Sequence, residues 1–241
     1  MDRSLSLVVL LLFLVASCTN ATTSQTDINV LRDIYSATSG NNWAYNCFSG
    51  TCGVPWNFSA SPVDPCASDN IWFGLVCSDN GETVSTLDLD MNALDGTIPT
   101  SIGSFESIIE IDLAVNNIRG TIPSQLGLLT DLITLNIGYN ELSGTLPDAL
   151  GSLQRCVNFD VVLNSLRGSI PEGLYNMTRL ENINLGINSL SGTLSSRIGH
   201  WTSATTMFMD GNMFTGSIPD TLTNFQNLTT LDLSDNLFNG R

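Results

Sequence analysis

The amino-acid sequence predicts an α/β solenoid, in which 24-residue coils stack around one continuous hydrophobic core. Three observations predict it. A glycine recurs every 24 residues, an asparagine stands four positions before each glycine, and apolar residues fill fixed positions ahead of each asparagine. A constant period of this length marks a stacked repeat protein, because a single repeat cannot bury its own apolar face. The glycines are Gly96, Gly120, Gly144, Gly168, Gly192, Gly216 and Gly240.

The repeats occupy residues 84–241, as six full copies and a seventh that stops after 14 residues. Ahead of each asparagine, apolar and polar residues alternate with a period of two, which predicts one short strand per repeat with its apolar side inward. Stacking then makes a parallel sheet. The asparagine at each strand end has both donors and an acceptor, so we expect it to satisfy the backbone groups of a buried turn.

Residues 22–83 are predicted to form a cap that closes the N-terminal end of the core. Residues 26–40 show apolar residues at helical spacing, with Asp27 as the expected N-cap and Gly40 at the expected end. Four cysteines that lie before the repeats predict two short disulfides and an oxidising compartment. Of the three connectivities we favour nearest-neighbour pairing, Cys47–Cys52 and Cys66–Cys77. Cys156 lies at a core position of its repeat and is expected to be a buried free thiol.

Residues 1–21 are predicted to be a secretory signal peptide, with Arg3 before an apolar run that is too short to span a bilayer. An alternative is a bacterial lipoprotein signal, which would make Cys18 a lipid anchor. Three N-x-S/T sequons favour simple cleavage and a eukaryotic secretory route. We therefore expect a secreted protein or one on the extracellular face of the cell membrane. The predicted glycosylation sites are Asn57, Asn176 and Asn227.

The motif G-T-I-P at residues 96–99 and 120–123, with its variants in later repeats, resembles the plant-type leucine-rich repeat family. The segments 27–43 and 66–77 are similar to the N-terminal cap of that family. The resemblance implies a right-handed superhelix with a concave parallel sheet and a disulfide-stapled cap. It is less specific for function, because the family includes receptor ectodomains, inhibitors of secreted hydrolases, wall proteins and ice-binding proteins.

Composition argues against several classes of function. The chain has 8 arginines, no lysine and 23 acidic residues, so nucleic acid is a poor partner. Its single histidine, His200, has no cysteine or carboxylate at ligand spacing, and the motifs of hydrolases, metalloproteases and phosphate-binding loops are missing from the sequence. We therefore expect no enzyme activity, no cofactor and no metal site.

Two columns of exposed positions on the concave sheet are the candidate binding surface. One column is acidic or amide, and we also read its charge as ordinary surface patterning. The other is apolar and could form a contact surface. Together they could accept a basic or amphipathic peptide. The candidate ligand-binding residues are Asp88, Met91, Asp112, Val115, Asn136, Tyr139, Asp160, Leu163, Asn184 and Ile187.

The leading functional prediction is thus an extracellular protein- or peptide-binding module of a receptor-like or secreted recognition protein. The alternative is a structural or ice-interacting extracellular protein, or a secreted hydrolase inhibitor. The ice version would use a column of hydroxyl residues that follow the repeat glycines: Thr97, Thr121, Thr145, Ser169, Thr193 and Ser217. Because the sequence stops inside a repeat, we expect a fragment, and a missing C-terminal part could carry a membrane span.

Overall fold

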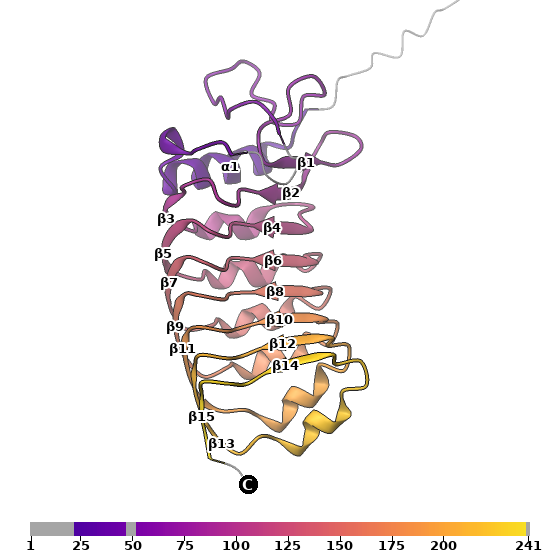
Figure 1. Cartoon of the computed structure of the whole chain (residues 1–241). Coiled ribbons are helices and arrows are strands. Elements are labelled where there is room, and N and C mark those ends of the chain that lie inside the picture. Colours follow the sequence, from indigo (N-terminus) through magenta and orange to yellow (C-terminus); the bar gives the residue numbers. More distant parts are fainter. Residues whose placement is uncertain (1–21, 47–51, 240–241) are drawn as a thin grey trace, which may run out of the picture.

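The computed structural model describes residues 22–46 and 52–239, which form a solenoid of stacked coils with a cap at its N-terminal end (Figure 1). The predicted signal peptide, Cys18 and Cys47 lie outside the described residues. Within the described part of the chain, no helix is long and apolar enough to cross a membrane.

The predicted concave sheet is present, and its strands run parallel in the repeats. Its order is β1-β2-β4-β6-β8-β10-β12-β14, and within the repeats each residue pairs with the residue 24 positions further on, as Ile111 does with Leu135. Only the cap strand β1 is antiparallel to its neighbour. The strands are β1 Leu75–Cys77, β2 Val84–Asp88, β4 Glu110–Asp112, β6 Thr134–Asn136, β8 Asn158–Asp160, β10 Asn182–Asn184, β12 Thr206–Phe208 and β14 Thr230–Asp232.

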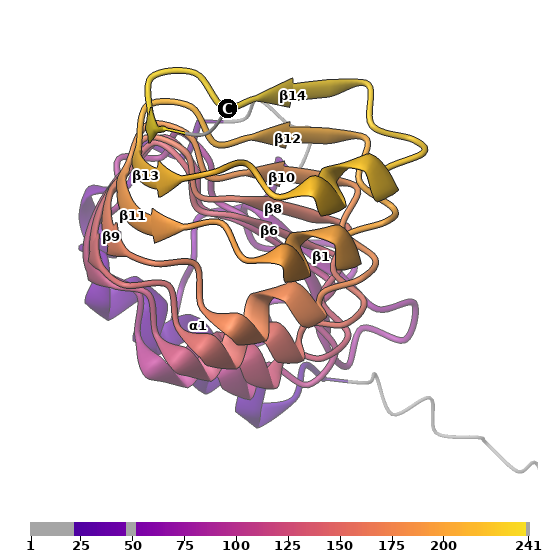
Figure 2. The same cartoon turned by 90° about the horizontal axis from the view of Figure 1, so that it is seen from below.

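A second, seven-stranded parallel sheet covers the adjoining side of the coils, as the end-on view in Figure 2 shows. The residues of the hydroxyl column directly follow the repeat glycines, and the close stacking of neighbouring coils accounts for glycine at those positions. Gly144 has φ +81°, and a Cβ there would come within 2.9 Å of Thr121 Cγ2 in the preceding repeat. The strands are β3 Asp95–Thr97, β5 Asn117–Thr121, β7 Glu141–Gly144, β9 Ser165–Gly168, β11 Ser189–Thr193, β13 Met213–Gly216 and β15 Leu237–Phe238.

The side opposite the concave sheet consists of short 3-10 helices, one in each repeat (Figure 2). Proline precedes five of the six and fixes the extended backbone from which the helix starts, while Ser195 takes that place in one repeat. The helices are η2 Thr100–Ser104, η3 Ser124–Leu128, η4 Asp148–Ser152, η5 Glu172–Asn176, η6 Ser196–His200 and η7 Asp220–Asn224.

The asparagine column satisfies backbone groups, as predicted, and it also joins successive repeats. Asn140 donates to the carbonyls of Gly138 in its own turn and Leu113 in the preceding repeat, at 3.0 and 2.9 Å. Its side-chain oxygen accepts from the amide of Ile118 in the preceding repeat, at 3.0 Å. The carboxamide therefore replaces the water that these buried groups would otherwise bind.

The cap contains the predicted amphipathic helix, but its first turn differs from the prediction. Helix α1 spans Gln25–Ala37, and its N-cap is Ser24, whose hydroxyl accepts from the amide of Asp27 at 3.1 Å. The assignment of Asp27 as the cap was wrong. Gly40 also does not end this helix, because it begins the short 3-10 helix η1, Gly40–Asn42. Asp27 is instead fully buried against the first repeat.

The disulfide Cys66–Cys77 is present in the cap, with 5.9 Å between the two Cα atoms. The other predicted pairing involves Cys47, outside the described residues, and stays a prediction. Cys156 is a buried free thiol, as expected, and burial raises its pKa to about 12. Its pKa therefore keeps the thiol protonated and unreactive at neutral pH.

Candidate functional site

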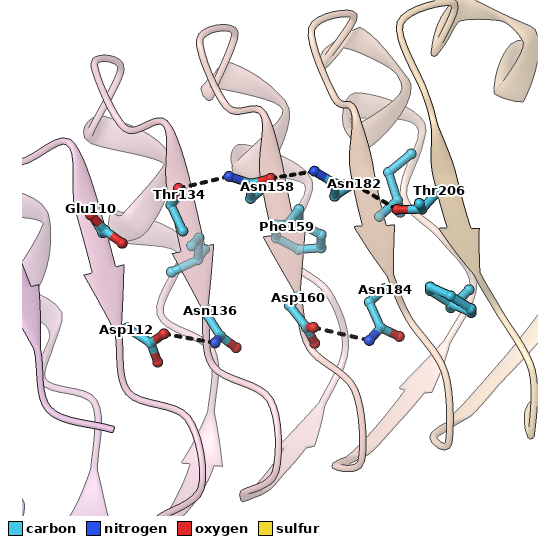
Figure 3. A pocket seen from close by; sticks show the side chains of 13 residues that line it. Glu110, Asp112, Thr134, Asn136, Asn158, Phe159, Asp160, Asn182, Asn184 and Thr206 are labelled. Atoms are coloured by element: carbon cyan, nitrogen blue, oxygen red, sulfur yellow. Dashed lines mark hydrogen bonds between the residues drawn. The ribbon is translucent and has the colours of Figure 1, made fainter. Parts of the chain in front are cut away.

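The concave sheet exposes two rows of side chains, which come from the first and third residues of each strand. From β4 to β12 the middle residue of each strand, such as Phe159, points into the core and is buried. The two rows line a trough of about 350 Å³ that runs from β4 to β12 (Figure 3). The first row is Glu110, Thr134, Asn158, Asn182 and Thr206, and the second row is Asp112, Asn136, Asp160, Asn184 and Phe208.

First-row side chains form a hydrogen-bonded chain across four strands (Figure 3). The Thr206 hydroxyl donates to Asn182 at 2.7 Å, Asn182 donates to Asn158 at 2.7 Å, and Asn158 donates to Thr134 at 3.1 Å. Each carboxamide has two N–H groups and uses one in this chain. Asn158 and Asn182 therefore each keep one N–H that can bind a ligand. This row stands two positions before the acidic column and is not among the binding residues predicted from the sequence.

The second row has a structural role in addition to its charge. The Asp112 carboxylate accepts from the amide of Ala114 at 2.9 Å, and Asp160 accepts from Val162 at 2.8 Å. These bonds stabilise the turn that ends each strand. Asn136 also donates to the second oxygen of Asp112 at 2.9 Å (Figure 3). An Asp or Asn at this position thus stabilises the turn, whether or not it also binds a ligand, although β12 has Phe208 there.

The trough and the surface beside β2 carry negative charge that no nearby protein cation neutralises. No Arg or Lys stands at any described position of the two rows. Burial, followed by the charges of Asp88 and Asp112, raises the pKa of Glu110. Burial and then Asp88 raise the pKa of Asp90 to about 6. Three of the arginines in the repeats pair with acids elsewhere: Arg119 with Asp95, Arg155 with Asp131, and Arg197 with Glu172.

The apolar column lies three residues beyond the second row, in the turns rather than in the strands. We call it the apolar stripe: Met91, Val115, Tyr139, Leu163 and Ile187. All five have the left-handed conformation, with φ between 48° and 54°, and their exposed fractions run from 40 to 49%. The prediction that they occupy strand positions was wrong, because the turn formed by the second row ends each strand first.

Backbone hydrogen bonds hold the apolar stripe in this conformation. The amide of Tyr139 donates to the carbonyl of Val162 at 2.7 Å, and its carbonyl accepts from the amide of Asn116 at 3.1 Å. The left-handed region costs an ordinary L-residue roughly 1–2 kcal/mol, and it is least suitable for β-branched side chains such as Val115 and Ile187. The later repeats place Gly211 and Asp235 here, which the conformation suits better.

The three predicted glycosylation sites are exposed on the surface of the protein. The side chain of Asn176 accepts from Arg197 at 2.9 Å, and that of Asn57 accepts from the amide of Ser59 at 3.0 Å. Exposure is compatible with glycosylation, which stays a prediction. Within the range that the structure describes, no three His, Cys, Asp or Glu side chains are placed to hold a metal ion.

Comparisons with known proteins agree with the architecture. The family described as Leucine Rich Repeat matches residues 131–153. The leucine-rich repeat receptor-like protein kinase PEPR2 of Arabidopsis thaliana is 35% identical over 54 residues, which are 22% of this chain and 5% of that protein.

Solved structures extend the likeness to most of the chain. PEPR1, in its crystal structure with AtPEP1, matches with a TM-score of 0.75 and 30% identity, over 88% of this chain and 28% of PEPR1. The Arabidopsis receptor kinase HAESA, in complex with the peptide hormone IDA and the co-receptor SERK1, matches with a TM-score of 0.71 and 25% identity. That match covers 86% of this chain and 33% of HAESA. The chain thus spans a third or less of the length of each of these receptors.

Proposed function

Because the chain is a leucine-rich repeat protein of the plant type, we propose that it is an extracellular module that binds a peptide or a protein on its concave face. The apolar stripe carries this proposal. Five large apolar side chains occupy left-handed turns that favour glycine, asparagine or aspartate, so neither burial nor backbone preference accounts for them. An exposed apolar row beside a polar trough suits a partner that covers it.

The comparisons support the same class of partner. HAESA was solved with the peptide hormone IDA and PEPR1 with AtPEP1, and both resemble this chain over most of its length. In this proposal the protein is a receptor-like or secreted recognition protein, delivered by the signal peptide and glycosylated at its sequons. The binding residues are the predicted ones on the second row and the apolar stripe.

The test removes the two central side chains of the apolar stripe. Peptides that bind the wild-type protein are first enriched from a displayed random library. Their affinity is then measured for the wild-type protein and for the double variant Tyr139→Ala/Leu163→Ala. We expect affinity to fall at least tenfold, about 1.4 kcal/mol or more, because central apolar anchors contribute most of the binding energy. The thermal transition should change little, since both side chains are exposed.

The matched control removes two other exposed apolar side chains, in Leu128→Ala/Met213→Ala. Leu128 lies on η3 and Met213 on β13, both away from the concave sheet. These changes should leave peptide affinity unaltered. Equal losses in the two double variants would mean that the peptides do not use the apolar stripe, and the proposal would fail.

A further inference from the structure

The trough is chemically different at its two ends. At the β4 end, Glu110 and Asp112 stand side by side as the first and third residues of one strand. Asp88 and Asp90, in and just after β2, extend the same charge beyond the trough. At the β12 end the second row changes from polar residues to Phe208, which is partly exposed. One end therefore suits a cation and the other a large apolar side chain.

Between these ends the trough has a single carboxylate, that of Asp160, and its other polar side chains are neutral amides and hydroxyls. The free N–H groups of Asn158 and Asn182 can donate to the carbonyls of an extended peptide. The neighbouring second-row carboxylate of Asp160 already accepts from Val162 and Asn184. The middle of the trough is thus suited to a peptide backbone rather than to a second charged group.

The length of the trough sets the length of its occupant. From β4 to β12 there are four strand intervals, and at about 4.8 Å each they span roughly 19 Å. An extended peptide rises about 3.3 Å per residue, so about six residues reach from one end to the other.

We infer that the trough binds an extended peptide segment of about six residues along the solenoid axis, with a cationic group at Glu110 and Asp112 and a large apolar side chain against Phe208. The inference rests on the proposed function and adds the chemistry and the orientation of the ligand. The cation is a lysine or arginine side chain or a free amino terminus, which share the same chemistry. Charge complementarity carries the assignment, because the carboxylates at this end have no basic partner among the described residues of the concave face.

The test is a set of fluorescent hexapeptides with blocked termini, measured by anisotropy. The first probe has lysine at one end, phenylalanine at the other and serines between. In the second, norleucine replaces lysine, and in the third, alanine replaces phenylalanine. A fourth probe has a free amino terminus in place of the lysine, and distinguishes the two sources of the cation.

Each end of the trough has its own protein variant. Glu110→Gln should weaken the first probe at least fivefold and leave the norleucine probe unchanged. Phe208→Asn, which installs the residue type that Asn184 provides in the same row, should weaken the first probe but not the alanine probe. Glu141→Gln, a change at an exposed position on β7, is the control and should have no effect.

Three results would overturn the inference: no binding of the first probe to the wild-type protein, equal loss of the lysine and norleucine probes in Glu110→Gln, or equal loss in Glu141→Gln. Its failure differs from that of the proposed function. Library peptides that depend on Tyr139 and Leu163 but not on Glu110 or Phe208 would leave the proposed function standing and refute this orientation. The opposite result is a first probe whose affinity falls as expected in Glu110→Gln and Phe208→Asn but does not change in Tyr139→Ala/Leu163→Ala. That result would support binding in the trough and refute binding on the apolar stripe.

Discussion

Asp27 accepts a hydrogen bond from the backbone amide of Val84, at 2.7 Å, although 57 residues separate the two. The other carboxylate oxygen accepts from the amide of Glu106 at 3.1 Å. Val84 begins the first repeat and Glu106 lies near its end, so one side chain of the cap helix is bonded to both ends of the first coil. Val84 is fully buried, so its amide would otherwise be a buried backbone donor without an acceptor.

Replacing Asp27 by alanine should lower the free energy of unfolding by about 2–4 kcal/mol, because two amides lose a charged acceptor. Urea denaturation measures the change. The control is Asp33→Ala, which removes an exposed carboxylate from the same helix and should cost well under 1 kcal/mol. A loss as small for Asp27 as for Asp33 would show that water replaces the carboxylate at Val84.

Replacing Asn140 by alanine should cost about 2 kcal/mol, since it leaves several backbone groups in two repeats unsatisfied. Hydrogen exchange should locate the damage: the amide of Ile118 should exchange faster. Asn117→Ala is the matched control, because Asn117 is exposed on β5. Unchanged exchange at Ile118 would contradict the role assigned to the asparagine.

Val115→Asn should stabilise the protein by up to about 1 kcal/mol, because asparagine tolerates the left-handed region better than a β-branched residue does. The same change should weaken binding of a ligand that covers the apolar stripe. Val76 is a matched control, with an exposed fraction of 43% against 41% for Val115 but a place in strand β1. There Val76→Asn should destabilise the protein. Destabilisation by both changes would argue against backbone strain at Val115.

Mild acid should stabilise the protein through Asp90. Its pKa is raised to about 6, so between the ordinary value of 3.8 and about 6 the folded state binds a proton that the unfolded state has released. This contribution is complete below the unfolded pKa and is lost as the pH rises through about 6. The raised pKa values of Glu110 and Asp112 act in the same direction. We expect urea midpoints to fall from pH 5 to pH 7, and to fall less in Asp90→Asn. An equal fall in the variant would assign the effect to the other carboxylates.

Sequence periodicity was sufficient to predict the concave sheet. The 24-residue period continues without a break, and the apolar positions of each repeat can be buried only by stacking the repeats in register. It also identified the asparagine column and the buried Cys156. Two features escaped it, for different reasons. The partner of Asp27 lies 57 residues away, and a local pattern contains no information about it. The apolar stripe was placed by extending the alternation past Asp112, where a side-chain bond to Ala114 turns the chain.

The asparagine column also constrains how such a chain can change in length. Between repeats its side-chain bonds recur at fixed offsets, as the oxygens of Asn116, Asn140 and Asn164 accept from the amides 22 positions before them. Duplicating or deleting one whole 24-residue unit reproduces all these offsets, so each surviving contact finds an equivalent partner. Inserting a single residue inside a unit changes the offsets of the bonds that span the insertion. The bonds between coils on either side of it keep their offsets. The number of coils is therefore free to vary in this architecture, while the phase within each coil is fixed.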